Sequence, residues 1–297
     1  MHYSLDGGAT WATSSIGVAA NAETIAKLGI MGSYLVAVSP TANTATRGGY
    51  YYATLNPLTG APGSWTKVTT GFTDTFEPRD MVVLGPREAY LCTDSGEILK
   101  IEDVPTGATS LGVVTSSDLT RISAYGNTIV AVGASGAVLR SINRGKSFAA
   151  VTTAPSANTL NAIEVLGEQR FYVGDSAGGV YYTENAGETA WTSILIGATA
   201  AAIQDIRFAT PEVGYIAYTI TGTLARVAAT INGGATWSLS DTSGNQRLQA
   251  PTTTLQRYNR IAVPETSDWF VNANNVVFGG LGGSTDGTLV LGTVDTF

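Results

Sequence analysis

Histidine and cysteine are almost absent from this sequence. His2 and Cys92 are the only residues of their kinds among 297. A histidine-based catalytic triad, a histidine-ligated zinc site and a cysteine-rich metal site all need more of these side chains. A single cysteine also excludes a disulfide within the chain. We therefore expect no metal and no cofactor, and the apolar neighbours of Cys92 predict a buried strand thiol.

Positive charge and long apolar runs are also scarce. The chain has 16 basic and 23 acidic residues and a net charge of −7. Nucleic-acid binding needs clustered lysine and arginine, so this balance argues against a nucleic-acid partner. No apolar run approaches the length of a membrane span, and the N-terminal residues lack the pattern of a signal peptide. We expect no membrane span.

Glycine and apolar residues are plentiful. There are 35 glycines, 44% of residues are hydrophobic and only 13% are charged. The apolar share is too high for a disordered chain. Together with the glycines it favours an all-β protein, made of many short strands joined by tight turns.

A short motif recurs along the chain. Residues 4–11 read SLDGGATW and residues 230–237 read TINGGATW. Residues 141–148 and 183–191 are divergent copies, and residues 54–65 are a stretched one. Its key positions hold an aspartate or asparagine, a glycine and an aromatic residue, namely Asp6, Gly8, Trp11, Asn56, Trp65, Asn143, Gly145, Phe148, Asn185, Gly187, Trp191, Asn232, Gly234 and Trp237.

This motif resembles the Asp-box, or BNR, repeat of the sialidase, sortilin and photosystem II assembly factor propellers. The resemblance implies a β-propeller in which the boxes lie on blade turns and have a structural role. The residues favour the same interpretation, because each copy lies between two short apolar runs. Asx-Gly turns supply the backbone conformation of a hairpin, and the asparagine or aspartate side chain caps nearby amides.

The spacing predicts blades of four short antiparallel strands. We expect six first strands, near residues 28, 82, 122, 163, 206 and 261, although a division into seven blades is possible. The sequence begins in a box and stops where a box is due. We therefore predict one propeller domain over residues 1–297, in which residues 1–16 complete the blade formed by residues 257–297 and so close the sheet edges.

Four arginines lie on predicted first strands. Arg79, Arg121, Arg207 and Arg260 could form a ring that binds an anion or an acidic segment; solvated or locally paired charges are the alternative. Two groups of acidic residues lack the spacing of calcium loops. The first is Asp74, Glu77 and Asp80, and the second is Glu102 and Asp103. We interpret both as solvated acidic loops.

Three functions remain open. The first is a non-enzymatic structural or interaction propeller: a virion (phage) surface, decoration or tail-associated protein that contacts other proteins, a second copy of itself or glycans. Such a propeller would be found in a virion or outside the cell, and the cytoplasm is the alternative location. The second is a sialidase-like glycoside hydrolase. The third is a chaperone like the photosystem II assembly factor.

Overall fold

The computed structural model describes residues 2–6, 9–16, 25–40, 48–72, 76–194, 196, 200–220, 224–239, 257–262, 275–281 and 287–293. Within these residues every regular element is a strand, apart from a short 3-10 turn at Ala134–Gly136. This confirms the all-β prediction. The chain forms two compact units. One comprises Met1–Ala124 with Gly145–Ala149, and the other comprises Tyr125–Arg144 with Ala150–Phe297.

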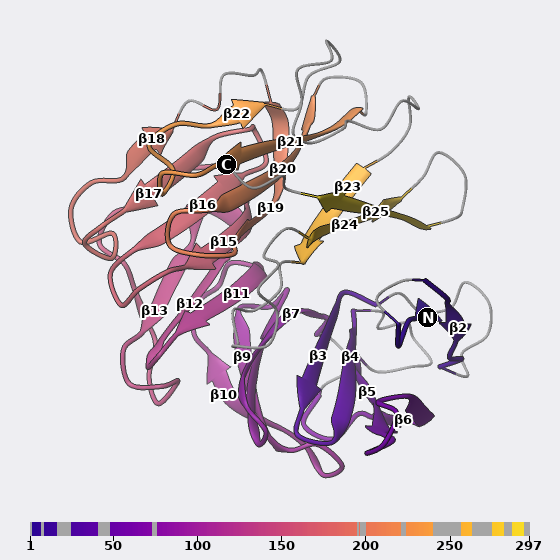
Figure 1. The fold of residues 1–297 in the computed structure, drawn as a ribbon. Coiled ribbons are helices and arrows are strands. Elements are labelled where there is room, and N and C mark those ends of the chain that lie inside the picture. The colour runs from indigo at the N-terminus through magenta and orange to yellow at the C-terminus, as the bar shows by residue number, and fades with distance from the viewer. Residues whose placement is uncertain are drawn as a thin grey trace. The chain divides into compact units, whose positions relative to one another are not determined.

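The strands form consecutive antiparallel sheets, which we number as blades in chain order (Figure 1). Blade 1 contains β3 (Lys27–Met31), β4 (Tyr34–Ser39), β5 (Gly49–Leu55) and β6 (Pro62–Val68). Blade 2 contains β7 (Pro78–Gly85), β8 (Glu88–Thr93), β9 (Glu97–Asp103) and β10 (Gly107–Val113). Blade 3 contains β11 (Leu119–Tyr125), β12 (Thr128–Gly133), β13 (Val138–Ser141) and β14 (Ala149–Ala150).

The later blades follow the same order. Blade 4 contains β15 (Leu160–Val165), β16 (Phe171–Asp175), β17 (Val180–Thr183) and β18 (Thr192–Ile194). Blade 5 contains β19 (Ala200–Phe208), β20 (Gly214–Ile220), β21 (Leu224–Thr230) and β22 (Ser238–Leu239). Blade 6 has three described strands, β23 (Arg257–Ala262), β24 (Asn275–Leu281) and β25 (Gly287–Thr293). Each of the six predicted first-strand positions falls inside a first strand, so the six-blade prediction holds for the described residues.

The first strands share an irregularity in their pairing. In blades 2, 4, 5 and 6 the register with the second strand shifts at one or two points along the first strand. The residues left without a partner at these shifts include Arg79, Asn161, Gln204 and Asn259. A bulge of this kind turns the side chains around it away from the regular alternation. The residues that directly follow these four are Asp80, Ala162, Asp205 and Arg260.

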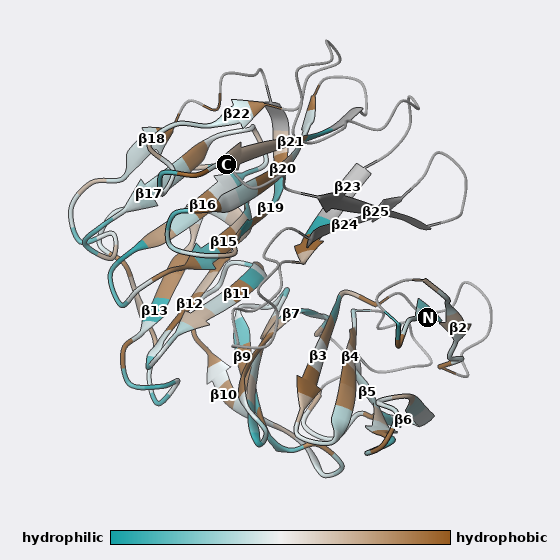
Figure 2. Ribbon diagram, viewed as in Figure 1, coloured by the Kyte–Doolittle hydropathy of each residue, from teal (hydrophilic) through white to brown (hydrophobic). Residues whose placement is uncertain are grey.

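The apolar core lies between consecutive blades within each unit. In the first unit, Met31 and Tyr50 of blade 1 pack in one cluster with Leu91 and Leu99 of blade 2. Figure 2 shows the apolar residues of β3 and β4 in brown. In the second unit, Ile203 of blade 5 packs with side chains of blade 4 in another cluster. Burying a side chain of this size stabilises the fold by about 1.5–3 kcal/mol.

The N-terminal residues form a small sheet of their own. β1 (His2–Tyr3) pairs with β2 (Ala12–Thr13). The indole N–H of Trp65 on β6 donates a hydrogen bond to Oγ of the buried Ser14, 2.7 Å away, so this segment packs against blade 1. The predicted pairing of residues 1–16 with residues 257–297, and the single domain that it would close, stay predictions.

Candidate functional site

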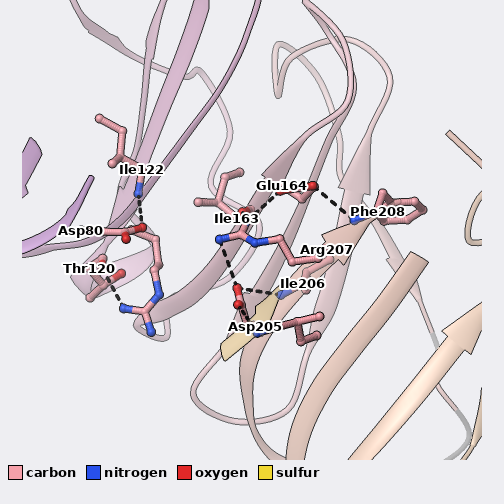
Figure 3. A network of polar contacts seen from close by, with 11 residues as sticks. Asp80, Thr120, Ile122, Ile163, Glu164, Asp205, Ile206, Arg207 and Phe208 are labelled. Atoms are coloured by element: carbon pink, nitrogen blue, oxygen red, sulfur yellow. Dashed lines mark hydrogen bonds and ion pairs between the residues drawn. The ribbon is translucent and has the colours of Figure 1, made fainter. Parts of the chain in front are cut away.

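Buried carboxylates on the first strands hold the next blade. Asp80 follows the bulge of β7 and is 1% exposed. Its Oδ2 accepts a hydrogen bond from the main-chain N–H of Ile122 on β11, at 3.2 Å (Figure 3). Asp205 occupies the equivalent position on β19 and is also 1% exposed. Its Oδ2 accepts the N–H of Ile261 on β23, at 2.9 Å.

A glutamate makes the same kind of link between blades 4 and 5. Oε1 of Glu164 on β15 accepts the main-chain N–H of Phe208 on β19, at 3.2 Å. Its Oε2 lies 2.7 Å from the guanidinium of Arg207, which also lies 3.6 Å from Asp205. Figure 3 shows Arg207 between the two carboxylates. Burial raises the pKa of Glu164 above its usual value of 4.5, and the charge of Arg207 opposes part of that rise.

The structure corrects our interpretation of Asp80. We expected a solvated acidic loop, but Asp80 is a buried acceptor at the start of a strand. Glu77 pairs with Arg79 at 2.9 Å, and Asp74 lies outside the described residues. The second acidic group, Glu102 and Asp103, is exposed as expected. The signal missed in the sequence is a carboxylate directly before an apolar residue at the start of a first strand.

The four predicted arginines lie on first strands but at different register positions. Arg79 is a bulge residue, Arg260 follows a bulge and Arg207 lies two residues beyond Asp205. Arg79 pairs with Glu77 and Asp94, and Arg121 donates to the carbonyl of Thr120. Arg207 is largely buried between carboxylates, so it serves the link between blades 4 and 5. A ring formed by all four stays a prediction.

The repeated motif forms the same hydrogen-bonded turn in several blades. In blade 5, Oγ1 of Thr230 donates to Oδ1 of Asn232 and accepts the N–H of Gly234. Asn232 Oδ1 also accepts the N–H of Thr236 at 2.9 Å. The turns of Asp6, Asn143 and Asn185 repeat the first contact, with a serine or threonine hydroxyl donating to the acidic or amide oxygen. The motif side chains therefore serve the turn itself.

The stretched and N-terminal copies differ in detail. Asn56 accepts the N–H groups of Leu58 and Thr59 through Oδ1, so it caps a local turn. Gly8 lies outside the described residues. Trp11 is 51% exposed, whereas Trp65, Phe148, Trp191 and Trp237 are partly buried. Trp11 is therefore the most exposed of these five motif aromatic residues.

Motif glycines also pack against tyrosines of the preceding blade. A Cβ atom on Gly145 would lie 2.3 Å from the ring of Tyr90 on β8. A Cβ atom on Gly234 would lie 2.9 Å from the hydroxyl of Tyr172 on β16. Tyr90 and Tyr172 hold equivalent register positions, because each lies two residues before the partner of the residue that follows the bulge. Glycine is required here because any side chain would overlap the ring.

The remaining sequence candidates lie apart from this network. Cys92 is buried on β8, as predicted. His2 is exposed, and its Nδ1 lies 3.3 Å from the hydroxyl of Thr13. Among the described residues, no group of three or more histidine, cysteine, aspartate or glutamate side chains is placed to hold a metal ion. In the same residues, no helix has the length and apolar character needed to cross a membrane.

Comparison with solved structures identifies the fold. YCF48 from Cyanidioschyzon merolae matches with a TM-score of 0.70 and 14% identity, covering 98% of this chain and 88% of that one. A structure of YCF48 bound to a D1 peptide matches with a TM-score of 0.51 and 13% identity, over 93% and 94%. The GH74 xyloglucanase from Xanthomonas campestris matches at 0.64 and 12%, over 89% of this chain and 44% of that one.

The sequence itself gives no such match. No protein-family model and no curated protein sequence matches it. At 12–14% identity the likeness to these structures concerns the fold alone. The sheets, their strand order and these neighbours together show that the chain is a β-propeller built from antiparallel blades.

Proposed function

We propose that this chain is a non-enzymatic interaction propeller that binds another protein. The observation that carries the proposal is the likeness over 98% of the chain to YCF48, together with the match to YCF48 bound to a peptide. The site geometry supports it, because Asp80, Glu164 and Asp205 use their carboxylates as acceptors for main-chain amides. Side chains engaged in this way stabilise the blades, which leaves the propeller surface for recognition.

Cross-linking of the native protein in its source, followed by mass spectrometry, tests this proposal. We expect cross-links from exposed residues of the chain to one recurrent protein partner, and the same partner after mild dilution. A chain that sediments alone and forms no recurrent cross-link would contradict it. A labelled D1 peptide tests the assembly-factor alternative, which is a special case of the same proposal.

The finer proposal is a virion surface, decoration or tail-associated role. Its support is the composition, with 13% charged residues, 35 glycines and few lysines. Fractionation of the source by sedimentation tests it, because a virion component travels with particles of viral size. Recovery only in fractions without particles would refute this placement and leave the interaction proposal standing.

A glycoside hydrolase is the second candidate, favoured by the likeness to the GH74 xyloglucanase. That protein is more than twice as long, since the match covers 44% of it. Incubation with xyloglucan and with a panel of fluorogenic glycosides tests this function. Turnover that one aspartate or glutamate substitution abolishes would establish it and overturn the non-enzymatic proposal.

A further inference from the structure

Three turns of the first unit, with the strand ends beside them, line an open cavity of about 270 Å³. They are the β3–β4 turn, the β7–β8 turn and the β9–β10 turn, so the cavity joins blades 1 and 2. Its lining residues are Met31, Gly32, Ser33, Tyr34, Pro86, Arg87, Glu102, Asp103 and Val104. Sites for drug-sized ligands measure roughly 300–1,000 Å³, so this cavity suits a smaller molecule.

The walls of the cavity are fixed by the fold. Gly32 has a φ of 59°, and a Cβ atom there would lie 3.4 Å from Pro86, so glycine lets the two turns approach. The hydroxyl of Tyr50 donates to the carbonyl of Val104 at 2.6 Å and holds the β9–β10 turn. Tyr34 meets Tyr52 edge to face at 5.4 Å. The cavity is therefore a preformed feature, with Met31 and Val104 as buried apolar lining.

The polar lining carries both signs of charge. Arg87, on the β7–β8 turn, is exposed and makes no hydrogen bond or ion pair with the residues that the structure describes. Asp103, the last residue of β9, accepts a hydrogen bond from the hydroxyl of Thr106 but has no cation against it among those residues. Glu102 differs, because Lys100 lies 2.7 Å from its carboxylate. The cavity thus offers one guanidinium and one carboxylate to a ligand.

We propose that this cavity binds a small zwitterion of the size of a free amino acid with an apolar side chain. The ligand carboxylate pairs with Arg87, whose planar guanidinium suits two parallel hydrogen bonds to a carboxylate. The ligand ammonium pairs with Asp103. The apolar side chain contacts Tyr34 and Pro86, the apolar lining residues that are not fully buried. A purely anionic ligand would leave Asp103 without a partner, and a purely cationic one would leave Arg87 without a partner.

Calorimetric titration of the whole chain with L-leucine tests the proposal. We expect one molecule bound per chain. Because Arg87 and Asp103 are both exposed, each ion pair contributes only modestly to the binding free energy. We therefore expect a dissociation constant of about 1 mM. N-acetyl-L-leucine lacks the ammonium and L-leucinamide lacks the carboxylate. Each should bind at least about fivefold more weakly than L-leucine.

Two substitutions assign the contacts. Arg87→Gln should weaken L-leucine about fivefold or more but should not weaken L-leucinamide, which has no carboxylate for Arg87 to bind. Asp103→Asn should weaken L-leucine but should not weaken N-acetyl-L-leucine, which has no ammonium for Asp103 to bind. Lys146→Gln removes an exposed cation away from the cavity and is the matched control for both. Unchanged circular dichroism and melting temperature establish that each variant is folded.

Three results would overturn the proposal. The first is no binding of L-leucine up to about 10 mM, roughly tenfold above the expected constant. The second is binding that Arg87→Gln leaves unchanged. The third is binding of D-glucose in place of L-leucine, which would assign the cavity to a neutral sugar.

Discussion

The hydroxyl of Tyr172 donates a hydrogen bond to the main-chain carbonyl of Gly233, 2.6 Å away, and so ties the second strand of blade 4 to the motif turn of blade 5. Arg170 donates to the same carbonyl at 2.9 Å. The motif turn is thus held by the preceding blade as well as by its own side chains.

Tyr172→Phe should lower the free energy of unfolding by about 1–2 kcal/mol, since it leaves the ring in place but removes the hydrogen bond donated to Gly233 and the one accepted from Arg170. Urea unfolding followed by tryptophan fluorescence measures this. Tyr125→Phe is the control, because Tyr125 is 54% exposed. Equal losses in the two variants would show that the hydroxyl of Tyr172 contributes nothing specific.

Gly145→Ala should destabilise the chain more than Gly126→Ala. Both glycines have positive φ, 78° and 58°, so alanine is strained at each. A Cβ atom at Gly126 meets nothing within 4 Å, whereas at Gly145 it overlaps the ring of Tyr90. The strain alone costs about 1 kcal/mol and the overlap about 1–3 kcal/mol more. Thermal melting of the two variants separates the cost of backbone strain from the cost of overlap with the ring. Equal melting temperatures would show that the overlap with Tyr90 costs nothing.

Asp80→Ala should cost about 1–3 kcal/mol, because it leaves the buried N–H of Ile122 without its acceptor. Asp80→Asn keeps an oxygen at the same place and should cost less. Asp118→Ala removes an exposed carboxylate from the same unit and is the control. If Asp80→Ala were as stable as Asp118→Ala, the hydrogen bond from blade 3 to Asp80 would contribute nothing to the free energy of unfolding.

Glu164 should give a pH dependence of stability. Its pKa in the folded chain is raised above 4.5, so above that pH the folded state binds more protons than the unfolded state. The contribution of this group to stability is therefore present below pH 4.5 and lost as pH rises through the folded-state pKa. The slope is at most about 1.4 kcal/mol per pH unit.

Glu164→Gln isolates this effect, because glutamine cannot titrate and keeps an acceptor for Phe208. Denaturant unfolding at several pH values should show wild-type stability falling relative to the variant as pH rises above 4.5. A difference that grows in the opposite direction would mean that Arg207 outweighs burial.

Asp6 should titrate at unusually low pH. Hydrogen bonds from the side chain and main chain of Thr10, then from Ser4, lower its pKa from 3.8 to about 2. Its contribution to stability is present above pH 3.8 and is lost as pH falls through about 2. Carbon NMR of the Asp6 carboxyl measures the pKa. Thr10→Val should return it toward 3.8 and Thr10→Ser should not, whereas an unchanged pKa in Thr10→Val would rule out the hydroxyl as the cause.

Much of the fold could be predicted from local signals. Apolar runs such as that of β12 mark strands, and the Asx-Gly turns mark hairpins, because both depend on residues close in sequence. The motif predicted its own turn for the same reason. The N-terminal pairing is different, since it depends on segments at opposite ends of the chain.

The network of the first strands was harder to predict. A carboxylate such as Asp80 is usually exposed, and its burial depends on a bulge and on an amide about forty residues away. The arginines were assigned by their place at strand starts, but the bulges put Arg79 and Arg260 at different register positions. The cavity at Arg87 joins three separate turns, and no local pattern marks it.

The links made by Asp80, Glu164 and Asp205 each use a main-chain N–H as the donor. Every residue except proline supplies that group, so only the accepting blade must keep a particular side chain. A duplicated blade would already have the main-chain N–H that the carboxylate of the preceding blade accepts. The side chains on its surface could then change without loss of this link. A propeller joined in this way can keep its architecture while the side chains of the receiving blade change.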